Sequence, residues 1–484
     1  MFFWTKPLGL KIFHQTAEKA ADPAVPGGTL PGVLANPAIG VRHPKIVLAC
    51  FAILDHSHLF KSGPPGSPAK NQARNDMRNG LFHFVTGTAF ALALSVSSAH
   101  AQKQYDPGAS DTEIKIGQTV PFSGPASAYA TLGRAQAAYF NMINEQGGVN
   151  GRKINLIQYD DAYSPPKAVE QVRKLVEGDE VLLTFQLIGT PSNAAVQKYL
   201  NAKKVPQLFA ATGASRFTDP KNYPWTLGFN PNYFVEGRIY GQYILKNIPD
   251  AKVAVLYQND DLGKDYLNGI KSGLGDKAAT MVVAEASYEI SDPTVDSQIL
   301  KLKSSGANVL FSASTPKFAA QTIKKIAELD WKPVHILDIN ATSVGAVMLP
   351  AGPENSKGVI SVNYGKDPLD PQWKDDPGMK KYFDFMAKHY PEGDKTSGFN
   401  AYGYSTAQLM VHVLKQCGDN LTRENVMKQA TNLKNVQLDL ALPGMSPSTT
   451  PNDYRLNKQL QMMRFNGERW EMFGPIMEDA SPAG

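Results

Sequence analysis

Strand-like and helix-like segments alternate along most of this chain, and the alternation limits the folds available to it. Residues 113–120 alternate apolar and polar side chains as a β-strand does, residues 128–144 follow with helical spacing, and residues 154–159 are the next strand. The pattern runs to residue 211 and restarts after a predicted helix at 233–247. Strands separated by helices of about 10–15 residues are typical of right-handed crossovers in parallel sheets. Two such runs predict an α/β chain with two lobes.

The same reasoning predicts further elements in both runs. Expected strands are 181–187, 207–211, 252–257, 281–286, 309–313 and 335–339, and expected helices are 167–176, 263–273, 294–304, 317–329 and one starting near Ser192. The last third contains a predicted strand at 358–362, helices at 377–389, 399–416 and 422–433, and a hairpin of 461–465 with 469–473 around Asn466-Gly467, a dipeptide that favours hairpin turns. The length of 484 residues suggests about three domains, but we expect these last segments to complete the two sheets.

The charge balance argues against a nucleic-acid-binding protein. The chain contains 49 Lys and Arg and 44 Asp and Glu, but residues 1–101 hold 9 of the basic and 4 of the acidic side chains, so residues 102–484 hold 40 of each. A neutral region with interspersed signs lacks the basic surface that binds phosphates. The only cysteines are Cys50 and Cys417, too few for a disulfide framework or a cysteine-rich metal centre. We predict no metal and no cofactor.

The N-terminal residues contain an export signal. Met77–Ala101 has a basic start at Arg78, an apolar stretch at 84–96 and an Ala-His-Ala cleavage site, as secretory signal peptides do. Cleavage after Ala101 would place the mature protein in the periplasm. A signal peptide acts at a chain's N-terminus, so we interpret residues 1–76 as an upstream extension that is disordered or is not translated.

The loops that follow the strands are rich in small hydroxyl residues. They cover residues 121–129, 189–193 and 211–215, and each precedes a helix. Ligands of open α/β sheets bind outside the carboxyl ends of the strands. A hydroxyl, free backbone N–H groups and the positive end of a helix together suit an anion such as a carboxylate. The alternative is that these Ser and Thr residues only cap helices, but three such loops at one sheet edge favour a binding site.

Catalytic motifs give little support for an enzyme. Ser164 and Lys167 match the S-x-x-K pattern of some serine hydrolases, but the intervening Pro165-Pro166 prevents one helix from presenting both side chains on one face. The neighbouring Asp160 and Asp161 end a predicted strand, where such residues usually cap the next helix or line the rim of a cleft.

Several stretches together carry a family resemblance. They are residues 114–117, 123–125, 144–151, 159–161, 210–212 and 252–256. In this order, behind a signal peptide, they make the mature chain similar to the periplasmic solute-binding proteins of ABC transporters, in the class that binds Leu, Ile and Val. The resemblance implies a type I periplasmic binding protein fold: two Rossmann-like lobes joined by three crossover segments, with the ligand cleft between the lobes.

The resemblance also implies where the lobes meet. The crossovers fall near residues 228–232, 361–365 and 442–445. One lobe then combines 108–229 with 364–443, and the other combines 230–363 with 444–476.

Ligand-binding positions of the family carry over onto this sequence with several departures. Its carboxylate-binding residues fall on Ala210 and Thr212, its first-loop aromatic on Tyr129, in the loop that also holds Ser123, and its third-loop serine on Gly189, next to Thr190. In the second lobe its tyrosines fall on Leu262 and Ser314, and the acid that holds a substrate ammonium falls on Asn340. Because Asn340 is uncharged, an ammonium would need another partner, for which Asp260, Asp261 and Asp338 are the candidates.

These expectations describe a secreted solute-binding protein and not an enzyme. Its ligand would be a small carboxylate, either a branched-chain amino acid or an aliphatic or aromatic acid without an α-ammonium. The mechanism would be hinge closure driven by contacts to both lobes, with the closed form recognised by a membrane permease. The alternatives are a sensory binding module for a signalling partner and an enzyme that uses the cleft.

Overall fold

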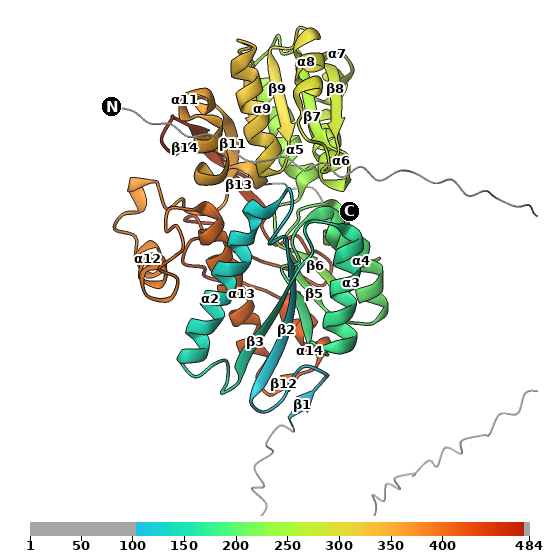
Figure 1. The fold of residues 1–484 in the computed structure, drawn as a ribbon, viewed down its shortest axis with the longest axis vertical. Coiled ribbons are helices and arrows are strands. Elements are labelled where there is room, and N and C mark those ends of the chain that lie inside the picture. The colour runs from blue at the N-terminus through green and yellow to red at the C-terminus, as the bar shows by residue number, and fades with distance from the viewer. Residues whose placement is uncertain (1–102, 479–484) are drawn as a thin grey trace, which may run out of the picture. The chain divides into compact units, whose positions relative to one another are not determined.

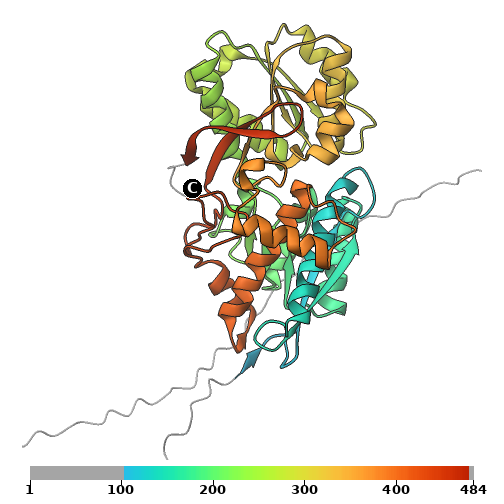
Figure 2. The same ribbon diagram turned by 90° about the vertical axis from the view of Figure 1, so that its left-hand side faces the viewer.

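The computed structural model describes residues 103–478. The predicted signal peptide at 77–101 and the upstream residues 1–76 lie outside the described residues. Within residues 103–478, the chain forms a five-stranded and a seven-stranded sheet, each flanked by helices, and a small two-stranded sheet of β1 (Gln104–Tyr105) and β12 (Asn420–Leu421) (Figures 1 and 2). The predicted α/β fold with two lobes is confirmed. We call the part built on the five-stranded sheet lobe 1 and the part built on the seven-stranded sheet lobe 2.

Lobe 1 contains a fully parallel sheet in the order β3-β2-β4-β5-β6. The strands are β2 (Glu113–Val120), β3 (Lys153–Asp160), β4 (Leu183–Phe185), β5 (Gln207–Ala210) and β6 (Thr226–Gly228). The helices are α2 (Ala130–Glu145), α3 (Pro165–Arg173), α4 (Thr190–Ala202), α12 (Pro377–His389), α13 (Gly398–Cys417) and α14 (Arg423–Ala430). The sequence did not predict β6, because three buried residues are too few to show a period.

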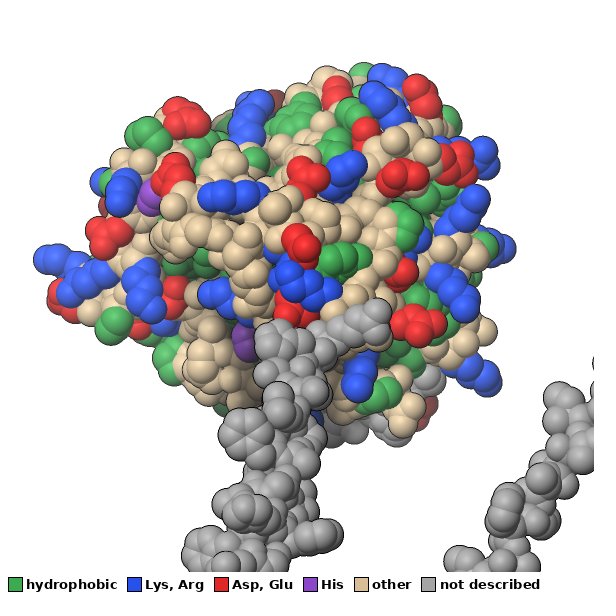
Figure 3. All heavy atoms as spheres, turned by 90° about the horizontal axis from the view of Figure 1, so that it is seen from below, with side chains coloured by type: hydrophobic (Ala, Val, Ile, Leu, Met, Phe, Trp, Pro, Cys, Tyr) green, Lys and Arg blue, Asp and Glu red, His purple; other side chains and the backbone are tan. Residues whose placement is uncertain are grey.

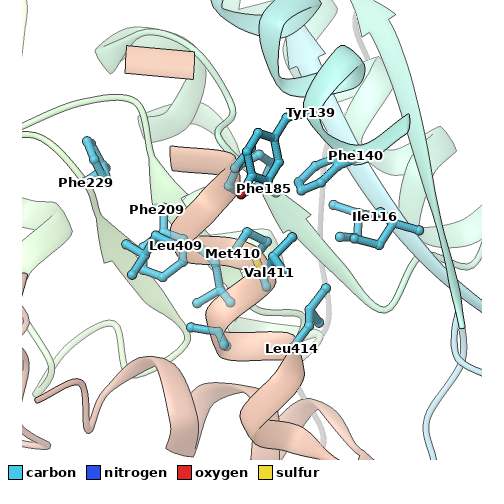
Figure 4. Packing of buried hydrophobic residues seen from close by; sticks show 14 of the residues in the cluster. Ile116, Tyr139, Phe140, Phe185, Phe209, Phe229, Leu409, Met410, Val411 and Leu414 are labelled. Carbon is cyan, nitrogen blue, oxygen red and sulfur yellow. The ribbon is translucent and has the colours of Figure 1, made fainter. Parts of the chain in front are cut away.

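The core of lobe 1 joins segments that are far apart in the sequence. Helix α13 buries Leu409, Met410 and Leu414, which Figure 4 shows gathered with Phe185 of β4 and Tyr139 of α2. These are apolar side chains removed from water, and each contributes about 1.5–3 kcal/mol when fully buried. The C-terminal helices therefore complete lobe 1 and do not form a third domain.

Lobe 2 contains the order β14-β13-β11-β10-β9-β7-β8. Strands β7 (Val253–Gln258), β8 (Val282–Tyr288), β9 (Val309–Ala313), β10 (Val334–Leu337) and β11 (Ile360–Asn363) are parallel. The hairpin of β13 (Gln459–Phe465) and β14 (Trp470–Glu478) extends the sheet, with β13 antiparallel to β11 and to β14, and Gly467 adopts a φ of +110° in its turn. The main helices are α5 (Tyr233–Asn247), α6 (Asp261–Leu274), α8 (Asp296–Ser304) and α9 (Pro316–Glu328).

The chain passes between the lobes three times. It does so between β6 and α5, between β11 and α12, and between α14 and β13. The residue boundaries that we assign to the lobes remain a prediction. None of the helices within residues 103–478 combines the length and hydrophobicity needed to span a bilayer. The face in Figure 3 mixes basic and acidic side chains without a broad area of one sign, in agreement with the balanced charge of residues 102–484.

Candidate functional site

A cavity opens where loops of both lobes meet. The cavity has a volume of about 180 Å³, whereas one water molecule needs roughly 10–15 Å³. Loops that follow β2, β3, β4 and β5 line it from lobe 1, and loops that follow β7 and β10 line it from lobe 2. Its wall is rich in aromatic side chains: Tyr129, Tyr163, Phe229, Tyr233, Tyr364, Phe399, Tyr402 and Trp470. A cavity with this lining suits a small organic ligand.

The predicted site residues divide into two groups. Tyr129, Gly189, Thr190, Leu262 and Asn340 line the cavity. The other five lie away from the lining or behind it: Ser123, Ala210, Thr212, Asp260 and Ser314.

Each of these five has a structural contact. Exposed Ser123 donates to Asp160 at 2.6 Å, and the carbonyl of Ala210 accepts the N–H of Thr212 at 2.7 Å. Asp260 caps helix α6. The N–H of Ser314 donates to Asp338 at 2.7 Å. Half of the predicted ligand-binding residues therefore line the cavity.

The N-terminus of α4 faces the cavity through Gly189 and Thr190. Gly189 is the N-cap, with a φ of 99°, and no side chain caps this helix. The first N–H groups of a helix have no partner within it, so that of Thr190 is available to a ligand. The Thr190 hydroxyl lies 2.9 Å from the Thr212 hydroxyl, which also accepts the N–H of Ala214. Hydroxyl groups beside the free N–H groups of a helix start are an arrangement that suits an anion.

Asn340 closes the lobe-2 side of the cavity, and its side chain is fully hydrogen-bonded. Its Oδ1 accepts from Asn230 at 2.9 Å and from the Tyr233 hydroxyl at 3.1 Å. Its Nδ2 donates to the Tyr266 hydroxyl at 3.2 Å and to Asp338 at 2.8 Å. An amide has two lone pairs and two N–H groups, so no position is left for a ligand ammonium unless one of these bonds breaks.

The family model for "Periplasmic binding protein" matches residues 113–469, well over half of the chain. The chain belongs to the periplasmic binding protein family. The resemblance seen in the sequence is therefore confirmed. A curated relative from Brucella abortus, "Leu/Ile/Val-binding protein homolog 7", is 25% identical over 339 residues, which cover 67% of this chain and 82% of the relative.

Two solved structures show the same fold in other periplasmic binding proteins. One is a branched-chain amino acid ABC transporter protein from Thermus thermophilus with bound valine, at 17% identity and a TM-score of 0.68, covering 77% of this chain and 98% of that one. The other, from Rhodopseudomonas palustris, is a solute-binding protein in complex with 3,4-dihydroxybenzoic acid, at 20% identity and a TM-score of 0.64, covering 77% and 99%. Both structures have the fold that this periplasmic binding protein has.

Two carboxyl groups lie behind Asn340 in this periplasmic binding protein, and the sequence did not predict their arrangement. Glu236 accepts from the hydroxyls of Tyr240 and Tyr266 and from the N–H of Ile339. Asp338 accepts from the N–H of Ser314 and from both nitrogens of Asn340. Burial raises the pKa of Glu236 to about 8 and that of Asp338 to about 7.

Tyr163 is a second residue that the sequence did not single out. It lines the cavity of this binding protein from the loop after β3, and its side chain is 3% exposed. The only signal in the sequence is its position just past the carboxyl end of a predicted strand. Such a position is common to many loop residues, so it does not identify a binding residue.

Proposed function

We propose that this protein captures a small carboxylate solute in the periplasm and delivers it to the permease of an ABC transporter. It would reach the periplasm through the signal peptide at 77–101, with cleavage after Ala101. The observation that carries the proposal is the uncapped N-terminus of α4, which presents Gly189 and Thr190 to an aromatic cavity between the lobes. There a carboxylate gains charge-assisted hydrogen bonds, and the aromatic wall covers the apolar remainder.

The solute that we favour has no ammonium group beside its carboxylate. The Asn340 side chain has no free acceptor. Both carboxylate oxygens of Asp260 accept protein donors, which are the N–H groups of Leu262 and Gly263 and the amide of Gln258.

Among the described residues that line the cavity, the one carboxylate is that of Asp367, which accepts the N–H of Leu369 and follows Lys366 in the cavity wall. An ammonium without a partner of its own costs several kcal/mol. An aromatic or aliphatic acid avoids that cost.

Closure follows from contacts that cross between the lobes. The Tyr129 hydroxyl donates to the carbonyl of Asn340 at 3.2 Å, and Arg216 pairs with Asp261 at 3.0 Å. A ligand that touches both walls adds to these contacts only when the lobes are together, so it shifts the population toward the closed form. The closed form is the state that a permease would recognise.

Thermal melting with matched ligand pairs tests the ligand class. The pairs are leucine with 4-methylpentanoate and phenylalanine with 3-phenylpropanoate, supplemented by valine and 3,4-dihydroxybenzoate. We expect the acids without the amine to raise the Tm of the purified protein more than the amino acids do, because ligand binding stabilises the folded state. If the amino acids alone raise the Tm, the preference is wrong and an aspartate near the cavity serves the ammonium.

Replacing Thr190 with Val tests the carboxylate position with any ligand found in that screen. If Thr212 donates to Thr190, the Thr190 proton remains free for the ligand. A hydrogen bond to a charged group contributes about 1.5–3 kcal/mol, so affinity should fall roughly 10- to 150-fold in calorimetric titration. Thr294→Val makes the same change at an exposed residue outside the cavity lining, so it is the control and should bind as the wild type does. An unchanged affinity in Thr190→Val would place the carboxylate elsewhere.

A further inference from the structure

The backbone at Ala162 and Tyr163 adopts a conformation that is rare for residues other than glycine. Ala162 has a φ of 50° and Tyr163 a φ of 59°, and neither is a glycine. Residues other than glycine in the left-handed region cost roughly 1–3 kcal/mol each and persist only where their surroundings hold them. Two in succession at the wall of a binding cavity indicate that the position of the Tyr163 side chain matters.

Two successive carboxylates hold this loop. Asp160 accepts the N–H of Ala162 at 2.9 Å, and Asp161 accepts the N–H of Tyr163, also at 2.9 Å. The N–H of Ser164 then donates to the carbonyl of Asp161 at 2.8 Å. Asp161 is fully buried, so it cannot follow the loop outward without losing its packing. The loop is therefore rigid, and the ring at its tip has a set position.

The Tyr163 ring lies on the backbone of Gly189. A Cβ atom added to Gly189 would come within 2.3 Å of Cε2 and 2.8 Å of Cζ of Tyr163. The ring therefore fills the space that a side chain of residue 189 would take, directly beside the N-terminus of α4. Burial raises the pKa of the Tyr163 hydroxyl well above its ordinary value, and the nearby charge of Asp260 of lobe 2 raises it further. The ring thus extends from the anion position to the opposite lobe.

We propose that Tyr163 is a specificity-determining residue that excludes ligands with a substituent on the carbon next to the carboxylate. This inference rests on the proposed function, since it takes the carboxylate to lie at Gly189 and Thr190. A rigid ring beside that point leaves room for a flat or unbranched carbon but not for a side group. The ligand class is then an aromatic acid, or an aliphatic acid that has no branch at the carbon next to its carboxylate.

Pairs of acids that differ by one methyl group test this proposal. The probes are 3-phenylpropanoate with 2-methyl-3-phenylpropanoate and 4-methylpentanoate with 2,4-dimethylpentanoate. In a packed pocket one methyl group changes affinity by roughly 10- to 200-fold. We expect the wild type to prefer the unsubstituted member by at least about tenfold in calorimetric titration.

Variants at Tyr163 and Ala162 separate the effect of the aromatic ring on specificity from the effect of the backbone conformation. Tyr163→Gly, which suits a positive φ, should bring the affinity ratio of each pair close to one, with the substituted acid gaining affinity. Tyr163→Asn, which also tolerates this backbone, is the second variant if the glycine form does not fold. Tyr163→Phe keeps the ring and should keep the ratio. Ala162→Gly relieves the neighbouring backbone and touches no ring, so it should keep the ratio as well.

The outcomes distinguish this proposal from the proposed function. If the wild type binds none of these carboxylates, the carboxylate function is wrong and the role of Tyr163 is wrong with it. If the wild type binds both members of each pair equally, or if both small variants keep the wild-type ratio, Tyr163 does not set specificity while the carboxylate function stands. A gain of affinity for the substituted acid is a result that a merely structural role of Tyr163 does not produce.

Discussion

The wild-type protein should lose stability as the pH rises from about 6.5 to about 8.5. Replacing Glu236 with Gln should remove most of that loss. The wild-type protein keeps a carboxyl group in a site where burial raises its pKa from 4.5 to about 8. Each unit of pKa difference corresponds to about 1.4 kcal/mol, so ionising this group costs several kcal/mol of folding free energy in all, of which about 2 kcal/mol is lost between about pH 6.5 and 8.5. Urea or thermal unfolding at a series of pH values measures the slope directly.

The sign follows from proton binding. A group whose pKa is raised in the folded state holds its proton there while the unfolded chain has lost it, so its contribution is complete below pH 4.5 and is lost up to about pH 8. Asp338, with a pKa of about 7, acts in the same direction. Burial lowers the pKa of His335 to about 4 from 6.5, which gives the opposite slope, but only below the chosen range.

Glu468→Gln is the matched control for this experiment. The Glu468 side chain is 86% exposed, so water solvates both of its forms and the wild-type slope should persist. The prediction fails if the wild type is equally stable at both ends of the range, or if Glu236→Gln keeps the full slope. Either result would mean that the three hydrogen-bond donors around Glu236 offset the free-energy cost of burying its ionised form.

Local patterns were sufficient to predict most elements of the fold. Residues 113–120, 233–247 and 309–313 form the strand, helix and strand that their spacing predicts, with the same ends. Each has a full period of apolar side chains or a clear boundary signal. Segment 226–228 has neither, and its role as the last strand of lobe 1 depends on pairing with β5.

The site was only partly predictable, because its chemistry depends on residues distant in the sequence. The loop at 189–193 gives a local signal, hydroxyl residues and a glycine before a helix, but α4 starts at Thr190, two residues before the expected start near Ser192. The hydrogen bonds that occupy the Asn340 side chain come in part from Asn230, Tyr233 and Tyr266. No local sequence pattern connects these residues to Asn340. The position of the Tyr163 ring similarly depends on its contact with Gly189. The sequence does not show this contact, because the two residues lie in different loops.

Glycines set the spacing of helices α5 and α6, each of which contributes one residue to the cavity wall. Helices α5 and α6 face each other through two G-x-x-x-G pairs, Gly237 with Gly241 and Gly269 with Gly273. A Cβ at Gly269 would lie 2.2 Å from the carbonyl oxygen of Phe234, and backbone atoms at that contact cannot rotate away. The helices therefore pack with their backbones in contact along two turns.

Gly269→Ala should consequently be one of the most damaging small substitutions in the chain. Alanine favours a helix by up to about 1 kcal/mol over glycine, but the added methyl group forces α5 and α6 apart along their whole interface. Overpacking of this kind typically costs about 1–3 kcal/mol, and more when backbone atoms oppose it. We expect a net loss of about 3 kcal/mol and a fall in Tm of roughly 4 °C.

The same variant should weaken ligand binding, because α5 and α6 carry cavity residues. Tyr233 is the first residue of α5 and Leu262 the second residue of α6, and both line the cavity. Separating the helices moves the Tyr233 hydroxyl away from Asn340, its partner at 3.1 Å. Gly178→Ala is the control, since the nearest atom to its added Cβ is the Cγ of Lys174 at 3.9 Å, and its stability should stay within about 0.5 kcal/mol of the wild type. If Gly269→Ala and Gly178→Ala have the same Tm, the backbone contact between α5 and α6 does not determine the position of the cavity wall.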